Sequence, residues 1–284
     1  MASHDNNGIN TASLAKNLSE IDGLTDTSNN EIREDTEILL PKYLKLNDIK
    51  YFLYEDGNVE KILEDKLPSR YQQVEYIESK GTQYIDTKFL PNYLTSVICK
   101  VNCTSGNIFG TGKGGYYSDF ALTAHSSGYY RALYKKVESQ TARGLDAVSV
   151  AFSSASNNTL CEIRVDKKGI FTNGILNEEF QQTYDFQSDA TMCLCVFHGN
   201  KYGEREYDGY MIGKIYYFKI IDNNQLLHNF IPCYTTTTIT DVDGIKRPKD
   251  TIGMYDTVTG QFHANKGTGT FGYGMEDGTY VAPQ

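Results

Sequence analysis

The sequence predicts an all-β protein whose main body is a packed β-sandwich. Two apolar runs, at residues 211–221 and 226–234, flank the turn-forming stretch Asp-Asn-Asn-Gln at 222–225, which is the pattern of a β-hairpin. We expect the first run to be covered on both faces and the second to end at Pro232 or to lie at a sheet edge. Short β-branched and aromatic runs, separated by Gly and Asn, recur from residue 70 onward, as in sandwiches and barrels. No helical periodicity is present after residue 66.

Residues 1–66 differ from the rest of the chain in charge and in pattern. They carry fourteen Asp or Glu and seven Lys or Arg, so most of the formal net charge of −9 lies here. The spacing of Leu and Ile predicts a short helix within residues 11–24, and residues 31–40 predict a second helix that Pro41 ends. Residues 49–54 and 59–63 flank Glu-Asp-Gly-Asn and predict a hairpin. We expect contacts with another chain to hold this segment, since it has too few large apolar residues for a core of its own; the alternative is that it rests on its own sandwich.

The other strands are predicted from apolar runs that end at turn-forming residues. Asn173 and Gly174, for instance, form a favoured two-residue hairpin turn. The stretch 110–115 is rich in Gly, but no helix follows it as a phosphate-binding loop requires, so it predicts a flexible turn. The predicted strands span residues 71–78, 82–87, 93–102, 116–122, 129–134, 147–152, 159–165, 169–172, 192–197, 252–255 and 261–262.

Composition and charge argue against several classes of function. The chain has 284 residues, of which 39% are hydrophobic and 22% charged, as in globular proteins. Its negative net charge argues against nucleic acid and anionic membranes as partners. No run approaches the roughly 18 apolar residues of a membrane span, and the polar N-terminus lacks a signal sequence, so we expect a soluble protein. We expect free, buried thiols, because no CxxC pair occurs among Cys99, Cys103, Cys161, Cys193, Cys195 and Cys233.

Five segments together resemble a known module. They are YQQVEYIESKGTQYIDT at 71–87, GKIYYFKI at 213–220, FIPCY at 230–234, IGMYD at 252–256 and NKGTGTF at 265–271. In this order and spacing they resemble the concanavalin A or laminin-G type jelly-roll module of tailed-phage virion structural proteins and of surface proteins of gut bacteria. The resemblance covers about residues 70 to 272 and implies a jelly-roll sandwich, a fold that hosts lectins, glycan-binding modules and hydrolases. We expect residues 67–284 to form this sandwich as a glycan-binding domain. The resemblance also implies that residues 1–66 form a small, partly helical segment that anchors the sandwich to a virion.

The acidic residues do not match a glycosidase pattern. Jelly-roll glycosidases resembling laminarinase carry Glu-x-Asp-x-x-Glu on one strand, and the stretch from Glu162 to Asp166 has a different spacing. Glu75 and Glu78 alternate onto opposite faces of a predicted strand. The five His are scattered, and no nucleophile elbow accompanies them. We therefore expect no enzymatic activity.

One short motif is a weak candidate for a metal site. Asp241 and Asp243 precede Gly244, as in some calcium loops, but no Glu or Asp follows at the offset that an EF-hand loop needs. We therefore expect no cofactor, with calcium at these two carboxylates as the alternative.

Aromatic residues give the main indication of ligand binding. Sugar rings present C–H faces that stack on aromatic side chains, while carboxylates, amides and Arg bond their hydroxyls. Two adjacent tyrosines in a strand point to opposite faces, so one of each pair belongs to the core. The candidate ligand-binding residues are Tyr116, Tyr117, Asp119, His125, Tyr129, Tyr130, Arg131, Tyr202 and Tyr207.

The resulting hypothesis is a phage virion structural protein, attached to a tail or baseplate, that binds host surface glycan without catalysis. Its expected partners are other virion proteins, through residues 1–66, and host polysaccharide. Because single lectin-like modules bind weakly, we also expect a homodimer or homotrimer. A capsid decoration or head-fibre protein is the first alternative, and a glycan depolymerase is the second.

Overall fold

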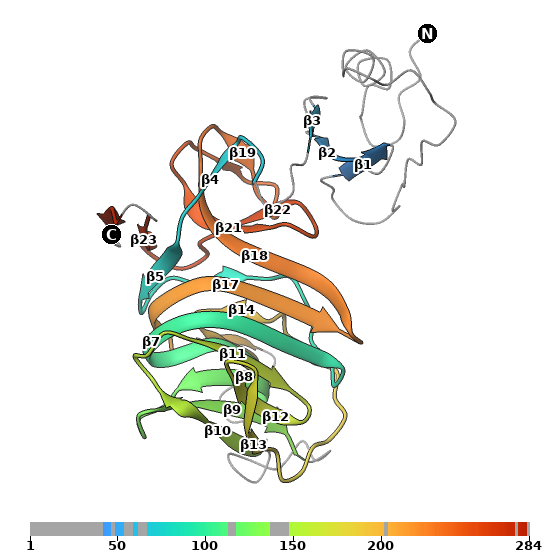
Figure 1. The fold of residues 1–284 in the computed structure, drawn as a ribbon, viewed down its shortest axis with the longest axis vertical. Helices are drawn as coiled ribbons and strands as arrows, with labels where there is room; N and C mark the ends of the chain where they lie inside the picture. The colour runs from blue at the N-terminus through green and yellow to red at the C-terminus, as the bar shows by residue number, and fades with distance from the viewer. Residues whose placement is uncertain are drawn as a thin grey trace.

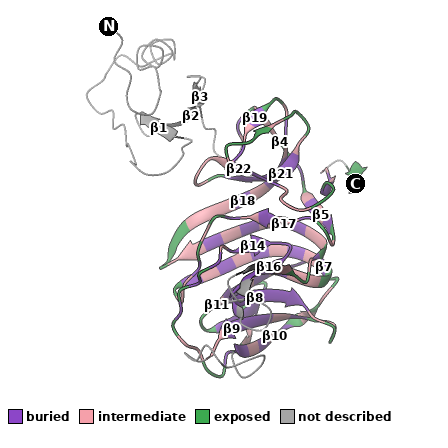
Figure 2. Cartoon of the chain, turned by 180° about the vertical axis from the view of Figure 1, so that it is seen from behind, coloured by how far each residue is buried: buried purple, intermediate pink, exposed green. Residues whose placement is uncertain are grey.

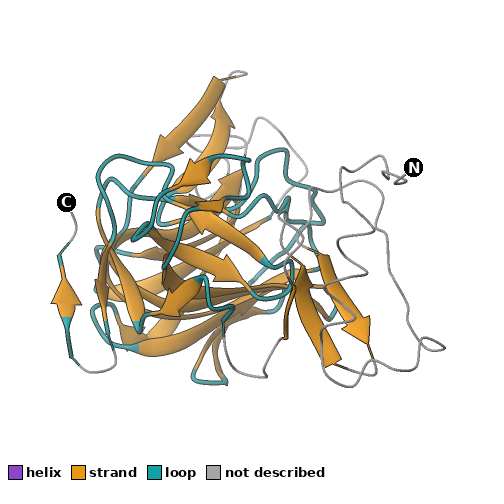
Figure 3. Cartoon of the chain, turned by 90° about the horizontal axis from the view of Figure 1, so that it is seen from above, coloured by secondary structure: helices purple, strands orange, loops and turns teal. Residues whose placement is uncertain are grey.

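The computed structural model describes residues 67–112, 118–136, 148–201, 204–275 and 278–282, together with the backbone of three strands near the N-terminus. Those residues form strands and loops without a helix (Figure 3). None of them forms a helix long and apolar enough to cross a membrane. The predicted all-β sandwich is confirmed for this part of the chain.

Two sheets face each other. The first, called here the major sheet, has the strand order β13-β12-β11-β7-β17-β18-β21-β22, with β4, β5, β23 and β24 added along β18 and β17. Its strands are β4 Tyr71–Gln73, β5 Tyr76–Lys80, β7 Thr95–Gly112, β11 Cys161–Asp166, β12 Gly169–Thr172, β13 Ile175–Glu179, β17 Ile212–Asp222, β18 Gln225–Thr235, β21 Ile252–Asp256, β22 Gln261–Ala264, β23 Gly272–Gly274 and β24 Tyr280–Val281. Figure 1 shows β7, β17 and β18 as long, curved neighbours.

The second sheet, called here the minor sheet, has the order β10-β9-β8-β7 and continues from β7 to β14 and β15. Strand β14 also pairs with β6, and β15 pairs with β16. Its strands besides β7 are β6 Ile85–Asp86, β8 Ser118–Ala124, β9 Tyr129–Lys135, β10 Val148–Ser156, β14 Cys193–Leu194, β15 Phe197–Lys201 and β16 Glu204–Asp208. A separate short ribbon pairs β19 Ile239–Thr240 with β20 Lys246–Arg247.

Strand β7 belongs to both sheets and forms the corner between them. Its first half pairs with β11 and β17, and its second half, from Gly106, pairs with β8. Gly106 has φ +88°, and a Cβ there would lie 2.6 Å from the carbonyl carbon of Tyr210 and 2.8 Å from Cα of Met211. Only glycine fits this bend. The Gly-rich turn predicted at 110–115 is therefore wrong for Gly110 to Gly112, which extend β7; residues 113–117 lie outside the described residues.

The main hydrophobic core lies between the sheets. Phe109 and Phe120 of the minor sheet contact each other at 5.1 Å between ring centroids, and Phe109 contacts Phe218 of the major sheet at 5.6 Å. A smaller core elsewhere combines Cys233, Ile239, Tyr255, Phe262 and Ala264 with the half-buried Leu67 and Tyr71. All six cysteines are free and buried, as predicted.

The hairpin of β17 and β18 is confirmed, but two details of its prediction are wrong. Only one face of β17 enters the core; buried residues alternate with half-buried ones along it (Figure 2), since tyrosine and lysine stems cover the other face without being sealed from water. Strand β18 does not end at Pro232: it runs on to Thr235, between β21 on one side and β4 on the other. The carbonyl of Pro232 accepts the Val74 N–H. The N and C=O groups of one strand residue point to the same side of the strand. The Pro232 nitrogen, which has no hydrogen to donate, therefore also faces Val74, in the break between β4 and β5, where no ladder partner needs it.

In the N-terminal segment, the structure places three strands in one antiparallel sheet, β1 Lys42–Leu46, β2 Ile49–Leu53 and β3 Val59–Lys61. The pair β2–β3 is the predicted hairpin, whereas β1 was not predicted. The helices predicted within residues 11–24 and 31–40 lie outside the described residues.

Candidate functional site

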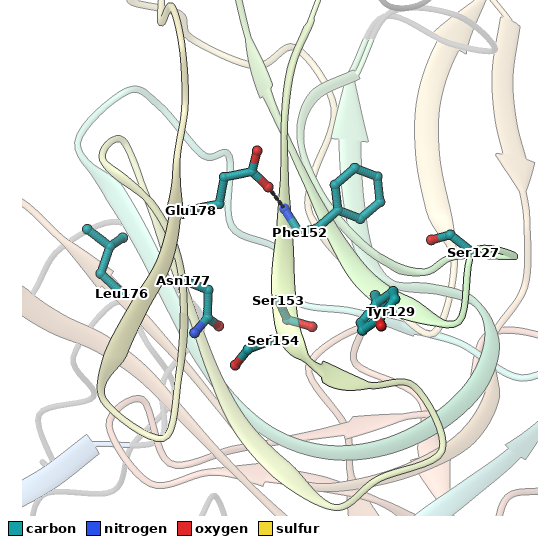
Figure 4. Close-up of a pocket in the computed structure, with 8 residues that line it drawn as sticks. All are labelled: Ser127, Tyr129, Phe152, Ser153, Ser154, Leu176, Asn177 and Glu178. Carbon is teal, nitrogen blue, oxygen red and sulfur yellow. Dashed lines mark hydrogen bonds between the residues drawn. The ribbon is translucent and has the colours of Figure 1, made fainter.

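A pocket of about 640 Å³ opens where β9, β10 and β13 approach one another. Strand β10 is the edge of the minor sheet and β13 is the edge of the major sheet. In Figure 4 the Tyr129 and Phe152 rings lie on one side of β10, and the residues of β13 lie on the other. The lining residues are Ser127, Tyr129, Phe152, Ser153, Ser154, Leu176, Asn177 and Glu178.

An irregularity in β10 shapes the floor of this pocket. The register between β9 and β10 shifts between Phe152 and Ser156, so the backbone there loses its ladder partners. The side chain of Ser153 replaces one of them: its Oγ accepts the Tyr130 N–H at 3.2 Å and donates to the Ala155 carbonyl at 2.6 Å. This irregular segment of β10 thus places Ser153 and Ser154 along the floor of the pocket.

Glu178 connects the edge strands of the two sheets. Its carboxylate oxygen Oε2 accepts the Phe152 N–H at 2.6 Å, a bond shown in Figure 4. The neighbouring Asn177 accepts a hydrogen bond from the Thr172 hydroxyl. The β13 side of the pocket is therefore fixed by bonds to two different strands, which holds its amide and carboxylate in place.

Tyr129 and Phe152 form the aromatic side of the pocket, and His125 packs against Phe152 next to it. The Tyr129 side chain is 44% exposed, and the Phe152 ring meets the His125 imidazole at 5.9 Å in a T-shaped contact. His125 Nδ1 accepts the Ser127 N–H at 3.1 Å. Slight burial and the nearby positive charge of Arg131 lower the pKa of His125, so its ring is neutral at pH 7.

Arg131 lies beside the pocket on the outer face of the minor sheet. It is the cross-strand partner of Thr123 on β8 and of Phe152 on β10. Alternation along β9 puts it on the same face as Tyr129. Arg131 Nε and Thr123 Oγ1 are both buried and have no hydrogen-bond partner.

Of the nine predicted binding residues, Tyr129 lines the pocket, while His125 and Arg131 lie beside it as neighbours of Phe152. Tyr130 is a correction, because it is fully buried in the core, where its hydroxyl accepts the Cys103 N–H and donates to the Thr159 carbonyl. Tyr116, Tyr117 and Tyr202 lie outside the described residues.

Asp119 and Tyr207 are also away from the pocket. Asp119 is buried near the opposite end of β8, 3.6 Å from Lys135 Nζ, and burial raises its pKa to about 6. Tyr207 stacks on His198 with ring centroids 4.7 Å apart and contacts Tyr84.

The two carboxylates considered for calcium bind cationic side chains of the protein itself. Asp241 Oδ1 accepts the backbone N–H groups of Asp243 and Ile245, and its Oδ2 accepts Arg247 Nε at 2.6 Å. Asp243 pairs with Lys88 at 2.7 Å and with Lys266. These oxygens already have charge partners, so the geometry is that of an ion-paired turn.

Sequence reasoning did not find Phe152, Asn177 or Glu178. They come from β10 and β13, which are adjacent only because the edges of two sheets meet. Phe152 reads as an ordinary strand residue, and the pair Asn177–Glu178 follows a turn in a polar stretch that carries no motif.

Comparisons with known proteins give one structural similarity to report. No protein-family model matches the chain, and no curated protein matches it in sequence. Among solved structures, it is similar to the native heptameric SAP-like pentraxin from Limulus polyphemus. The identity is 12% and the TM-score is 0.37, and the aligned part covers 56% of this chain and 82% of the pentraxin chain.

Proposed function

We propose that the sandwich is a glycan-binding module and that the pocket beside Tyr129 is its binding site. The observation that supports this most is an exposed tyrosine ring beside a phenylalanine, in a pocket otherwise lined mainly by hydroxyl, amide and carboxylate groups. Ligand sites typically combine an apolar wall with a few fixed polar groups. A sugar ring can stack its C–H face on Tyr129 while its hydroxyls bond Ser154, Asn177 and Glu178.

We further propose that binding occurs without catalysis. Of the eight lining residues, only Glu178 carries a carboxyl group, and one oxygen of that group already accepts a backbone N–H. Hydrolysis of a glycosidic bond needs two carboxyl groups about 5 to 10 Å apart on either side of the bond. A second carboxylate is missing from the described lining, which favours a binding role.

The proposed setting is the surface of a tailed-phage virion, at the tail or baseplate. This part rests on the resemblance of the five sequence segments to virion modules and on the acidic character of residues 1–66, which would attach the sandwich to other virion proteins. Several copies on one particle would raise a weak affinity through avidity. A decoration or fibre protein on the capsid is the alternative setting.

The binding proposal is tested with host wall polysaccharide and a glycan array. Tyr129→Ala should weaken binding at least about tenfold, the usual loss when an aromatic contact in a site is removed. The matched control is Tyr280→Ala, which removes a tyrosine of similar exposure (48%) from the edge of the major sheet. Equal binding by wild type and Tyr129→Ala would contradict the assignment of the site. Release of reducing sugar from the polysaccharide would contradict a non-enzymatic role.

The virion proposal needs a separate experiment. A phage lacking residues 1–66 of this protein should assemble particles that lack the sandwich, while the truncated protein stays soluble. Particles that still incorporate the truncated protein would contradict the anchoring role. A cryo-EM map of the particle would then distinguish tail from capsid.

A further inference from the structure

We infer that the Tyr129 pocket continues into an anion subsite at Arg131, so that the ligand is an acidic glycan whose charged group binds this guanidinium. The inference rests on the proposed function, because it names the class of glycan that the same site selects.

The position of Arg131 is fixed by the register of three strands. Thr123, Arg131 and Phe152 are consecutive cross-strand neighbours on β8, β9 and β10. Arg131 and Tyr129 lie two residues apart on one face of β9, so their Cβ atoms are about 7 Å apart. A disaccharide that stacks on Tyr129 can therefore present a substituent to Arg131.

The groups around Arg131 can all donate a hydrogen bond. Arg131 Nε and Thr123 Oγ1 are buried without a hydrogen-bond partner, a costly arrangement; because Nε is shielded, a ligand meets this guanidinium through its other two nitrogens. His125 adds a third donor: its Nδ1 accepts the Ser127 N–H, so the neutral ring carries its proton on Nε2. Among the described residues no carboxylate pairs with Arg131.

This donor set fits an anion better than a neutral hydroxyl. A guanidinium half removed from water gains most from a charged acceptor, and its planar fork matches the two oxygens of a carboxylate. Glu178 lies on the opposite side of β10 from the Tyr129 and Phe152 rings (Figure 4), and its carboxylate accepts the Phe152 N–H. The site thus has a cationic end at Arg131 and an acceptor end at Glu178, which suits a sugar with an acid at one end and free hydroxyls at the other.

The first test is a direct titration of the full-length protein followed by NMR. Sodium glucuronate should shift the Arg131 Nε–H resonance, and methyl glucoside at the same concentration should not. Glucose 6-sulfate and glucose 6-phosphate distinguish a carboxylate from other anionic substituents. If glucuronate up to 50 mM leaves this resonance unchanged while the sulfate and phosphate sugars also have no effect, the anion subsite is refuted.

The second test uses a glycan array containing matched acidic and neutral oligosaccharides. Arg131→Gln should weaken binding of acidic glycans at least about tenfold, as expected for a lost charge-assisted hydrogen bond, and should leave neutral glycans unaffected. Arg131→Lys should recover only part of the affinity, because it keeps the charge and loses the fork. The control Arg164→Gln removes an arginine that stacks on Phe171 in the major sheet. It should leave the binding of both acidic and neutral glycans unchanged.

The outcomes separate the two proposals. If neutral glycans bind, depend on Tyr129 and are insensitive to Arg131→Gln, the anion subsite is wrong and the glycan-binding function stands. If no glycan on the array binds and no sugar perturbs the Tyr129 or Arg131 resonances, both proposals are refuted. Arg131→Gln could instead lose all binding and also melt at a lower temperature, which would mean that the variant is misfolded. In that case the NMR titration of the wild type decides: a shift of the Arg131 resonance with glucuronate supports the anion subsite, and no shift with any anionic sugar refutes it.

Discussion

Asp119 and the pair Tyr129–Tyr130 show how the environment of a single residue decides its role. The two tyrosines are adjacent, yet one is 44% exposed at the pocket and the other is fully buried, because alternate strand residues face opposite sides of a sheet. Asp119 reads as a surface acid in the sequence, but it is only 4% exposed. Its ionised form is therefore poorly solvated, and Lys135 offsets this only in part.

The first prediction concerns the pH dependence of stability at Asp119. Burial raises its folded-state pKa from 3.8 to about 6, so the folded state holds its proton more tightly than the unfolded state. Between about pH 4 and pH 6 the free energy of unfolding should therefore fall as pH rises, by up to about 3 kcal/mol.

Asp119→Asn should remove this pH dependence, because the amide does not titrate. The check is chemical denaturation of both proteins at pH 4, 5, 6 and 7. The stability difference, variant minus wild type, should increase with pH across this window. A difference that is constant from pH 4 to 7 would show that Asp119 titrates normally.

At the scale of the element, β7 and β13 do the most to build the site. Strand β7 turns from one sheet into the other at Gly106, which sets the angle at which the two sheets meet. Strand β13 then reaches the edge of the minor sheet through Glu178. The pocket exists because β7 and β13 bring together two sheet edges, at β10 and β13, that are not paired to each other as strands.

The second prediction tests the corner in β7. Gly106→Ala should destabilise the fold by more than about 3 kcal/mol, because a left-handed conformation and a backbone clash coincide there. Gly128→Ala is the matched control: it has φ +91° but nothing within 4 Å of its Cβ position, so only about 1 kcal/mol of conformational strain is expected. Denaturant unfolding measures both. Equal losses in the two variants would mean that the close approach to Tyr210 is unimportant.

The third prediction tests the connection made by β13. Glu178→Ala removes the acceptor of the Phe152 N–H and should cost about 1 to 3 kcal/mol. Glu179→Ala is the control, since the Glu179 side chain is 61% exposed and pairs with Lys168 at 3.5 Å across the surface, where a change below about 1 kcal/mol is expected. Amide hydrogen exchange at Phe152 gives a local readout and should speed up only in Glu178→Ala.

For the whole molecule, the second core ties the first described residues of the sandwich to strands far along the chain. Leu67 and Tyr71 pack against the cluster around Tyr255 and Phe262, and the Tyr71 and Phe262 rings stack at 5.6 Å. Leu67 and Tyr71 are thus tied to strands β21 and β22, about 190 residues later in the chain.

The fourth prediction follows from that packing. A protein that starts at Leu67 should fold and melt cooperatively, whereas one that starts at Val74 should lose several kcal/mol of stability, because a half-buried tyrosine and a half-buried leucine are removed from the second core. Circular dichroism melts of the two truncated proteins decide this. Identical melting temperatures would show that the second core does not depend on these residues.

Local chemistry was sufficient to predict the fold class and much of the hairpin pattern. The turn at Asn223 and Asn224 has positive φ at both residues, as the sequence Asp-Asn-Asn-Gln indicates, and strand alternation correctly placed one residue of the pair Tyr129–Tyr130 in the core. Both features depend on residues close together in the chain, so they can be predicted from the local sequence.

Only the tertiary structure decided which residues form the pocket. Phe152 and Glu178 are 26 residues apart, and their contact depends on how the corner at Gly106 orients one sheet against the other. The continuation of β18 through Pro232 likewise depends on a gap between β4 and β5. Local sequence determined that this chain forms β-strands, because side-chain alternation is a local property. The site was set by sheet packing, because edge strands meet only after the whole core has formed.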